Sequence, residues 1–188
     1  MINTRDAFVA ASCLALNLTL AKAAAILSLP VYLDCVGTIL AAALVPSIET
    51  ILVAILTSLL GGVVINPYFA AYAGTQLAIA LTALACVRRG LFRSWARSIL
   101  GGLLIAAVAV IVSAPVTALL FGGVTLSGTT AVNALLLASG RNIWQSVIGG
   151  SILIESVDKP AAAILAWYTL SRLPSHLRAG SGAPPNAA

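Results

Sequence analysis

The chain has 188 residues, of which 61% are hydrophobic and only 8% are charged, and its formal net charge is +5. This length allows one domain and leaves no room for a separate soluble catalytic module, while the composition is typical of an integral membrane protein. A net positive charge would indicate nucleic-acid binding in a soluble protein. Here the positive-inside rule explains the charge, so we exclude nucleic acid as a partner.

Hydropathy predicts an all-α integral membrane protein, built as a six-helix transmembrane bundle. A helix needs about 20 residues to cross a hydrocarbon core of roughly 30 Å. The second predicted span has roughly eleven residues, so we expect it to be tilted, extended by its neighbours or partly interfacial. The predicted spans cover residues 6–29, 35–45, 50–65, 75–87, 98–121 and 147–171.

Two other segments differ from these spans. Residues 122–146 form a long outer segment whose apolar middle, 131–138, predicts a re-entrant or surface helix. Residues 179–188 consist mainly of Gly, Pro and Ala, which predicts a disordered tail. We therefore expect a single transmembrane domain over residues 1–178.

The basic residues predict the orientation of the bundle. Four arginines, at positions 88, 89, 93 and 97, gather between the fourth and fifth predicted spans. Because short cytoplasmic loops collect Lys and Arg, this loop is predicted to be cytoplasmic, and both termini then lie on the same side. Arg5, Arg172 and Arg178 also fall on that side, whereas Arg141 falls in an outer loop.

The sequence lacks the residue patterns that catalytic and metal sites require. The three cysteines, at positions 13, 35 and 86, have no paired spacing and indicate neither a disulfide framework nor a zinc site. The single histidine, His176, lies in the predicted cytoplasmic tail, and no clustered nucleophile and base or metal-ligand spacing is present. We predict a protein that is not an enzyme and that holds no metal or cofactor.

Charged residues inside predicted spans carry the strongest functional signal. Glu155, Asp158 and Lys159 lie in the sixth span and Lys22 lies in the first. A charge that faces lipid near the membrane centre costs roughly 2.5–3.5 kcal/mol, so these side chains must face protein or water. They either neutralise one another, with Glu155 paired to Lys159 and Asp158 to Lys22, or point into a water-filled pocket.

A pocket open to the outside would suit a small polar metabolite. Lys22 and Glu155 have similar depths below the outer ends of their spans, so they can meet if these helices are neighbours. Aromatic residues in the outer loops act either as interface anchors or as a lid over the ligand. The candidate lining residues are Asn17, Lys22, Tyr32, Asp34, Tyr68, Tyr72, Asn142, Trp144, Gln145, Glu155, Asp158 and Lys159.

A stripe of small residues marks one face of the first span. Ala7, Ala11 and Ala15 repeat every four residues, a spacing that lets another helix approach closely. In an alanine-rich chain the same spacing also serves packing within the bundle. The stripe is therefore a candidate docking face for a partner helix.

Two segments together resemble a known family. Residues 29–40 read Leu-Pro-Val-Tyr-Leu-Asp-Cys-Val-Gly-Thr-Ile-Leu and are followed by an alanine-rich helix and, in the third span, by Gly61-Gly62. Near the last helix the sequence reads Glu-Ser-Val-Asp-Lys over 155–159. Together with six predicted spans and both termini inside, this pattern resembles the substrate-binding S components of energy-coupling factor (ECF) transporters.

The resemblance implies a membrane-embedded subunit that captures a vitamin or related micronutrient from outside, in the cytoplasmic (inner) membrane of a bacterium. It implies docking of Ala7, Ala11 and Ala15 on a transmembrane coupling protein, and a gating role for the loop from Pro30 to Asp34. Two cytosolic ATPases would hydrolyse ATP, and this sequence contains no phosphate-binding loop motif of its own. The resemblance does not identify the substrate.

Other classes of protein fit part of the pattern. A solitary carrier that works without ATPases, coupled to protons through Glu155, Asp158 and Lys159, is the main alternative. A membrane sensor or scaffold is a weaker one, because no output domain follows Arg178. Dependence of uptake on ATPase subunits separates the first alternative from an ECF importer.

Overall fold

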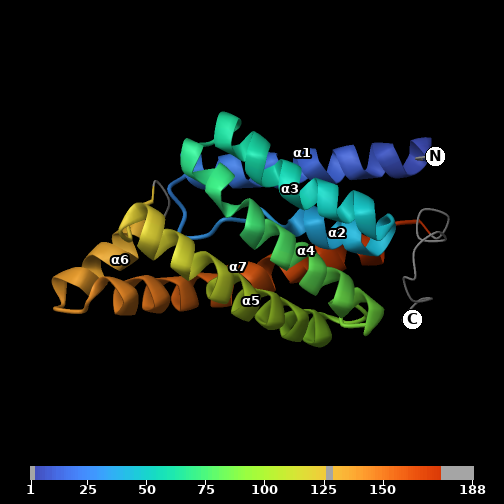
Figure 1. Cartoon of the computed structure of the whole chain (residues 1–188). Coiled ribbons are helices and arrows are strands. Elements are labelled where there is room, and N and C mark those ends of the chain that lie inside the picture. Colours follow the sequence, from blue (N-terminus) through green and yellow to red (C-terminus); the bar gives the residue numbers. More distant parts are fainter. Residues whose placement is uncertain (1–2, 126–128, 175–188) are drawn as a thin grey trace.

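The computed structural model describes residues 3–125 and 129–174, and this part of the chain is all-helical and contains no strand. The elements are α1 (Thr4–Ile26), α2 (Val36–Leu44), α3 (Ser47–Val64), the 3-10 helix η1 (Pro67–Tyr72), α4 (Ala73–Arg88), α5 (Trp95–Phe121), α6 (Thr129–Ala138) and α7 (Ile143–Arg172). The predicted all-α class is confirmed (Figure 1). The predicted tail, residues 179–188, lies outside the described residues.

Four segments of the described chain are long and apolar enough to cross a membrane: Thr4–Ile26, Ser47–Val64, Pro67–Arg88 and Trp95–Phe121. The helix α7 has 30 residues, but any stretch of it long enough to span contains Glu155, Asp158 and Lys159. The helix α2 has nine residues, so it is only about 14 Å long and cannot cross alone. These two elements depart most from the predicted six spans.

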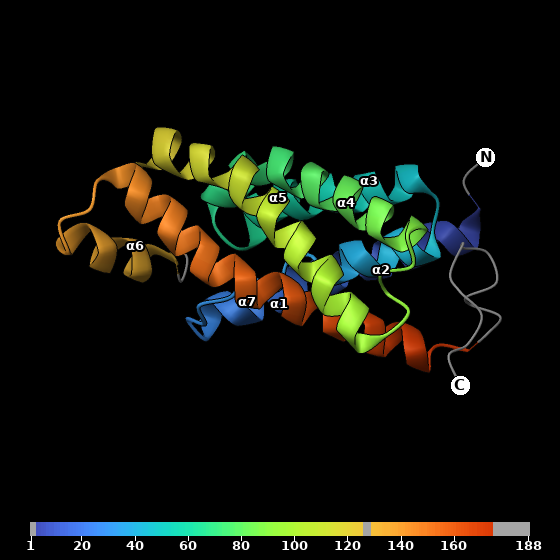
Figure 2. The same cartoon turned by 90° about the horizontal axis from the view of Figure 1, so that it is seen from below.

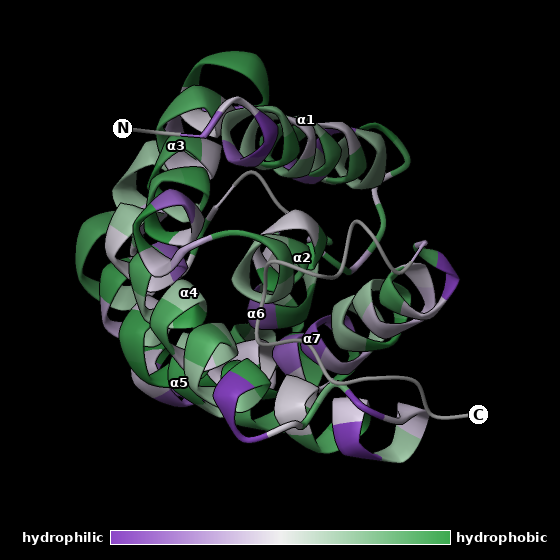
Figure 3. Ribbon diagram, turned by 90° about the vertical axis from the view of Figure 1, so that its right-hand side faces the viewer, coloured by the Kyte–Doolittle hydropathy of each residue, from purple (hydrophilic) through white to green (hydrophobic). Residues whose placement is uncertain are grey.

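The short helix α2 is the centre of the bundle. All nine of its residues are buried, and it contacts α1, α3, α4 and α7 (Figure 3). Its sequence is apolar on every face, as expected for a helix surrounded by others. At Gly37 a side chain would collide with the backbone carbonyl of Cys13 in α1, so glycine is required for this close contact.

Asn17 of α1 fixes the start of α2. Its side-chain oxygen accepts a hydrogen bond of 2.6 Å from the Gly37 backbone N–H. Its amide nitrogen donates to the hydroxyls of Thr38 and Thr57 at 2.9 and 3.0 Å. A fully buried amide with all these partners is a structural joint between α1, α2 and α3.

The bundle has two distinct ends (Figure 1). The start of α1, the end of α7, the turn between α2 and α3 and the turn between α4 and α5 lie at one end. There the Arg88 side chain donates to the Ser47 hydroxyl at 3.3 Å. The other end carries α6, η1 and the segment after α1 (Figure 1). The arginine-rich loop after α4 and the start of α1 therefore lie at the same end.

The helices α5 and α7 cross and make the most extensive contact between two elements of the described chain (Figure 2). At Gly102 an added Cβ would lie 2.5 Å from the Pro160 Cα and 2.8 Å from the Lys159 carbonyl oxygen. Glycine therefore lets α5 rest directly on the α7 backbone. This contact holds the charged part of α7 against α5.

The predicted orientation can be tested by labelling single cysteines, after the buried Cys13, Cys35 and Cys86 have been replaced. We expect an impermeant maleimide to label Ser139→Cys in intact cells and to label Ser94→Cys only after lysis, because the arginine-rich loop is predicted to be cytoplasmic. The opposite pattern would invert the topology.

Gly102→Ala should destabilise the protein by about 1–3 kcal/mol, because the methyl group forces α5 away from α7. The measurement is the thermal midpoint in detergent. Gly74→Ala is the control, since an added Cβ there meets no atom within 4 Å. Equal midpoints for the two variants would contradict the close crossing.

Candidate functional site

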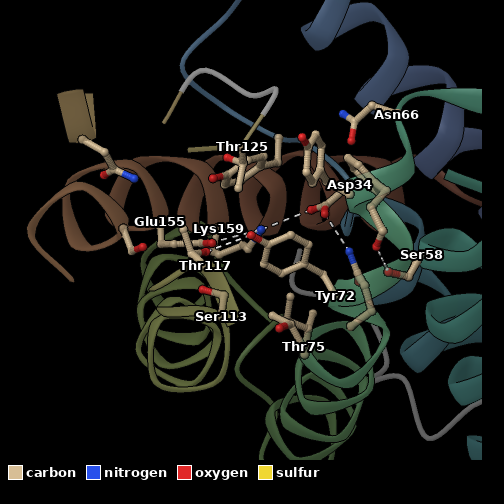
Figure 4. Close-up of a pocket in the computed structure, with 17 residues that line it drawn as sticks. Asp34, Ser58, Asn66, Tyr72, Thr75, Ser113, Thr117, Thr125, Glu155 and Lys159 are labelled. Atoms are coloured by element: carbon tan, nitrogen blue, oxygen red, sulfur yellow. Dashed lines mark hydrogen bonds and ion pairs between the residues drawn. The ribbon is translucent and has the colours of Figure 1, made fainter. Parts of the chain in front are cut away.

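A cavity lies among α3, η1, α4, α5 and α7 and is bordered by the loop between α1 and α2 (Figure 4). About 60 Å³ is open to the centres of water-sized molecules, several times the roughly 10–15 Å³ that one water needs. It therefore has room for a small organic group. The lining residues are Tyr32, Asp34, Ser58, Asn66, Tyr68, Phe69, Tyr72, Thr75, Gln76, Ile79, Ser113, Thr117, Thr125, Asn133, Ser151, Glu155 and Lys159.

Lys159 is the electrostatic centre of this cavity. Its ammonium nitrogen lies 2.7 Å from Asp158, 3.2 Å from Asp34 and 3.2 Å from Glu155. The side chain is 2% exposed, so water does not compensate its charge. An ammonium group has three donors, and here three carboxylates surround it. Figure 4 shows Asp34, Glu155 and Lys159 converging at the cavity wall.

Asp158 connects α7 to the loop between α1 and α2. One carboxylate oxygen accepts hydrogen bonds of 2.8 Å from the backbone N–H groups of Tyr32 and Leu33. The other oxygen bonds Lys159. Leu33 has a positive φ of 52°, a conformation that non-glycine residues adopt only when their surroundings hold it. Asp158 thus fixes the loop beside the cavity.

Asp34 extends the polar cluster to α4. One of its oxygens accepts from the Gln76 amide at 2.6 Å, and the other from Lys159 at 3.2 Å. The loop that ends at Asp34 is therefore tied to two helices through side chains. Irregular backbone at membrane depth is tolerated when protein groups satisfy it in this way.

Aromatic side chains form another part of the wall. Phe121 of α5 makes an edge contact with Tyr68 at 4.8 Å between ring centroids and a tilted contact with Tyr72 at 6.0 Å. The Tyr72 hydroxyl lies 2.8 Å from the Thr117 hydroxyl. The Tyr32 ring lies 5.3 Å from the Lys159 nitrogen. These rings are held in place by the protein, which suits a preformed ligand site.

Six of the twelve residues predicted to bind a ligand line the cavity: Tyr32, Asp34, Tyr68, Tyr72, Glu155 and Lys159. The predicted pair of Glu155 and Lys159 is present at 3.2 Å. The sequence left two alternatives open: the charges neutralise one another, or they line a pocket. These two residues do both.

The structure places the other six candidates elsewhere. Asp158 lies behind the cavity wall, and its charged partner is Lys159 in place of the expected Lys22. Lys22 donates to the Val64 carbonyl at 2.9 Å on the surface. Similar depth predicted that Lys22 could meet Glu155, but depth along a helix does not give the direction of a side chain around it. Of the remaining four, Asn17 joins helices by hydrogen bonds, and Asn142 and Gln145 cap the start of α7. The fourth, Trp144, is partly exposed.

Several lining residues were not predicted. Gln76 and Thr75 begin α4, Ser113 and Thr117 lie four residues apart in α5, and the cavity also includes Ser58, Asn133 and Ser151. The available signal was polarity within apolar helices, because a buried amide or hydroxyl needs a partner. Helical spacing of Ser113 and Thr117 places both on one side of α5.

Comparisons with known proteins do not identify the chain: no protein-family model matches it, and neither curated proteins nor solved structures show significant similarity to it. Function must therefore be argued from the cavity and from the surfaces of the bundle.

Lys159→Met should destabilise the protein by about 3–5 kcal/mol, because it leaves three buried carboxylates without their common cation. Lys22→Met is the matched control, since that lysine bonds one surface carbonyl and should change stability by less than about 1 kcal/mol. Chemical denaturation followed by near-ultraviolet circular dichroism measures both. A Lys159→Met variant as stable as the control would contradict the central role of this lysine.

Proposed function

We propose that this protein is the membrane-embedded substrate-binding subunit of an ECF-type importer and captures a small vitamin-like molecule from outside the cell. The observation that carries the proposal is the cavity, which is enclosed by helices, lined by aromatic and polar side chains and placed near the end opposite the arginines. A ligand-binding membrane subunit needs these features and no catalytic group.

The position of the cavity supports capture from outside. Its lining includes η1 and the loop before α2, which lie at the end away from Arg88 and the start of α1 (Figure 1). Since the arginine-rich end is predicted to be cytoplasmic, a ligand would enter from the outer side. We propose a multi-pass protein of the cytoplasmic membrane of a bacterium, with six crossings. The crossings are α1, the loop with α2, α3, η1 with α4, α5 and α7.

The helix α1 offers a face for a partner. Ala7, Ala11 and Ala15 are all exposed, while the face that contains Cys13 and Asn17 packs on the bundle. Among the four candidate spans, α1 has the smallest buried share, 22%. A row of small exposed residues allows the backbone of another membrane helix to approach closely. We propose that a transmembrane coupling protein docks there and that two cytosolic ATPases supply the energy.

A solitary carrier is the second candidate, and the acidic surroundings of Lys159 favour it. Buried carboxylates next to a lysine are typical of proton relays in transporters. The two candidates differ in their energy source. If uptake continues without any ATPase subunit and stops when the proton gradient is removed, the protein is the carrier and not the importer subunit.

Native mass spectrometry of the purified protein tests the binding function directly. We expect a co-purified small molecule that dissociates on activation and that is reduced in amount when Tyr72, a cavity residue, is changed to Ala. Uptake of that molecule by cells with and without the ATPase subunits then tests the importer. Protein that carries no molecule and binds none would argue against a binding subunit.

Ala11→Trp should abolish uptake while ligand affinity in detergent changes less than about threefold, because a bulky side chain separates α1 from the partner helix and lies far from the cavity. Ala107→Trp, on an exposed position of α5, is the matched control and should transport normally. Normal transport by Ala11→Trp would remove the docking role of α1.

A further inference from the structure

The charges around the cavity do not balance. Asp34, Glu155 and Asp158 are three carboxylates and Lys159 is one ammonium, so the ionised cluster carries a net charge of −2. Two of the carboxylates have further donors: Asp158 accepts from two backbone N–H groups and Asp34 accepts from Gln76. Within the described part of the chain, the polar partner of Glu155 is Lys159. Glu155 is therefore the least compensated carboxylate, and it faces the cavity.

Two amide side chains beside the cavity also have an acceptor oxygen that receives no hydrogen bond. Gln76 uses its nitrogen to donate to Asp34, and Asn133 uses its nitrogen to donate to the Gly123 carbonyl. Both partners can only accept, so neither amide can be turned around. Gln76 is 2% and Asn133 1% exposed, and neither carbonyl oxygen has a hydrogen-bond partner among the described residues. Gln76 thus keeps a spare acceptor oxygen at the cavity wall, whereas the Asn133 oxygen lies against Gly150 of α7.

The aromatic residues suit a cation as well. The Tyr32 ring already lies 5.3 Å from the Lys159 ammonium, and Tyr68 and Tyr72 border the same space. Electron-rich ring faces attract cations, with energies that rise when water is excluded. A bare metal ion fits less well, because Lys159 lies among the carboxylates that would have to bind it, and no group of metal-ligand residues occurs in the described chain.

We propose that the cavity selects a small organic cation, a protonated amine or a positively charged nitrogen heterocycle, with Glu155 facing the positive charge. The spare carbonyl of Gln76 accepts from an N–H group of the ligand. This inference deepens the proposed function, on which it rests, by giving the substrate class of the same cavity. Lys159 then orients the three carboxylates and is not itself the ligand-binding charge.

Three probes of nearly equal size and shape test the charge preference: benzamidine, which is a cation at pH 7, benzamide, which is neutral, and benzoate, which is an anion. Binding to the purified full chain in lipid nanodiscs is measured from the concentration dependence of the thermal midpoint. We expect benzamidine to bind at least tenfold more tightly than benzamide, and benzoate to bind more weakly than either.

Glu155→Gln should remove at least tenfold of the benzamidine affinity and leave benzamide within about threefold. Glu49→Gln is the matched control, since Glu49 is also buried with an oxygen that lacks a hydrogen bond but begins α3, away from the cavity. If Glu155→Gln does not fold, the comparison of the three probes on the unchanged chain decides the charge preference by itself.

The outcomes separate the two proposals. Saturable binding with no preference among the probes, or with benzoate bound best, would overturn the cation preference and leave the binding function in place. A benzamidine preference that survives Glu155→Gln would also overturn it. No saturable binding of any probe, with no co-purified molecule by mass spectrometry, would overturn both.

Discussion

The buried ammonium of Lys159 makes the interactions on which the half of the structure away from the arginine-rich loop depends. An isolated charge in hydrocarbon would cost several kcal/mol, so carboxylates must lie next to it. Two come from the same helix and the third, Asp34, comes from more than a hundred residues earlier in the chain. That long-range partner draws the loop after α1 into the bundle, and the position of α2 follows from the position of this loop.

An irregular loop inside a membrane bundle is stable only if its backbone groups find partners. Asp158 supplies two acceptor contacts to Tyr32 and Leu33, and Gln76 holds the side chain of Asp34. With the loop fixed in this way, α2 needs only nine residues to reach the arginine-rich end. The space beside the loop, which a full-length helix would have filled with side chains, becomes the cavity.

Much of the fold could be predicted from the sequence, because apolar length, prolines and arginine positions act locally. Each predicted span corresponds to a helix, and the apolar stretch 131–138 lies in α6. The site was harder to predict, because the depth of a residue along a helix does not say in which direction its side chain points around the helix axis. Lys22 and Glu155 have similar depths, yet Lys22 faces the surface and bonds Val64 while Glu155 faces the cavity. Asn142 and Gln145 looked like ligand groups but form a capping box at the start of α7.

The cost of burying a charge also explains why Glu155 differs from the other two carboxylates. Buried ion pairs can often be replaced by apolar residues with no loss of stability or with a gain of about 1–4 kcal/mol, so the fold alone does not need a carboxylate here. Asp158 differs, because the loop backbone depends on it, and Asp34 differs, because it joins the loop to α4. Glu155 holds no backbone group in the described chain and shares its one cation with two other carboxylates. A positive charge inside the cavity would compensate it, and the spare carbonyl of Gln76 would then gain the donor that the protein does not provide.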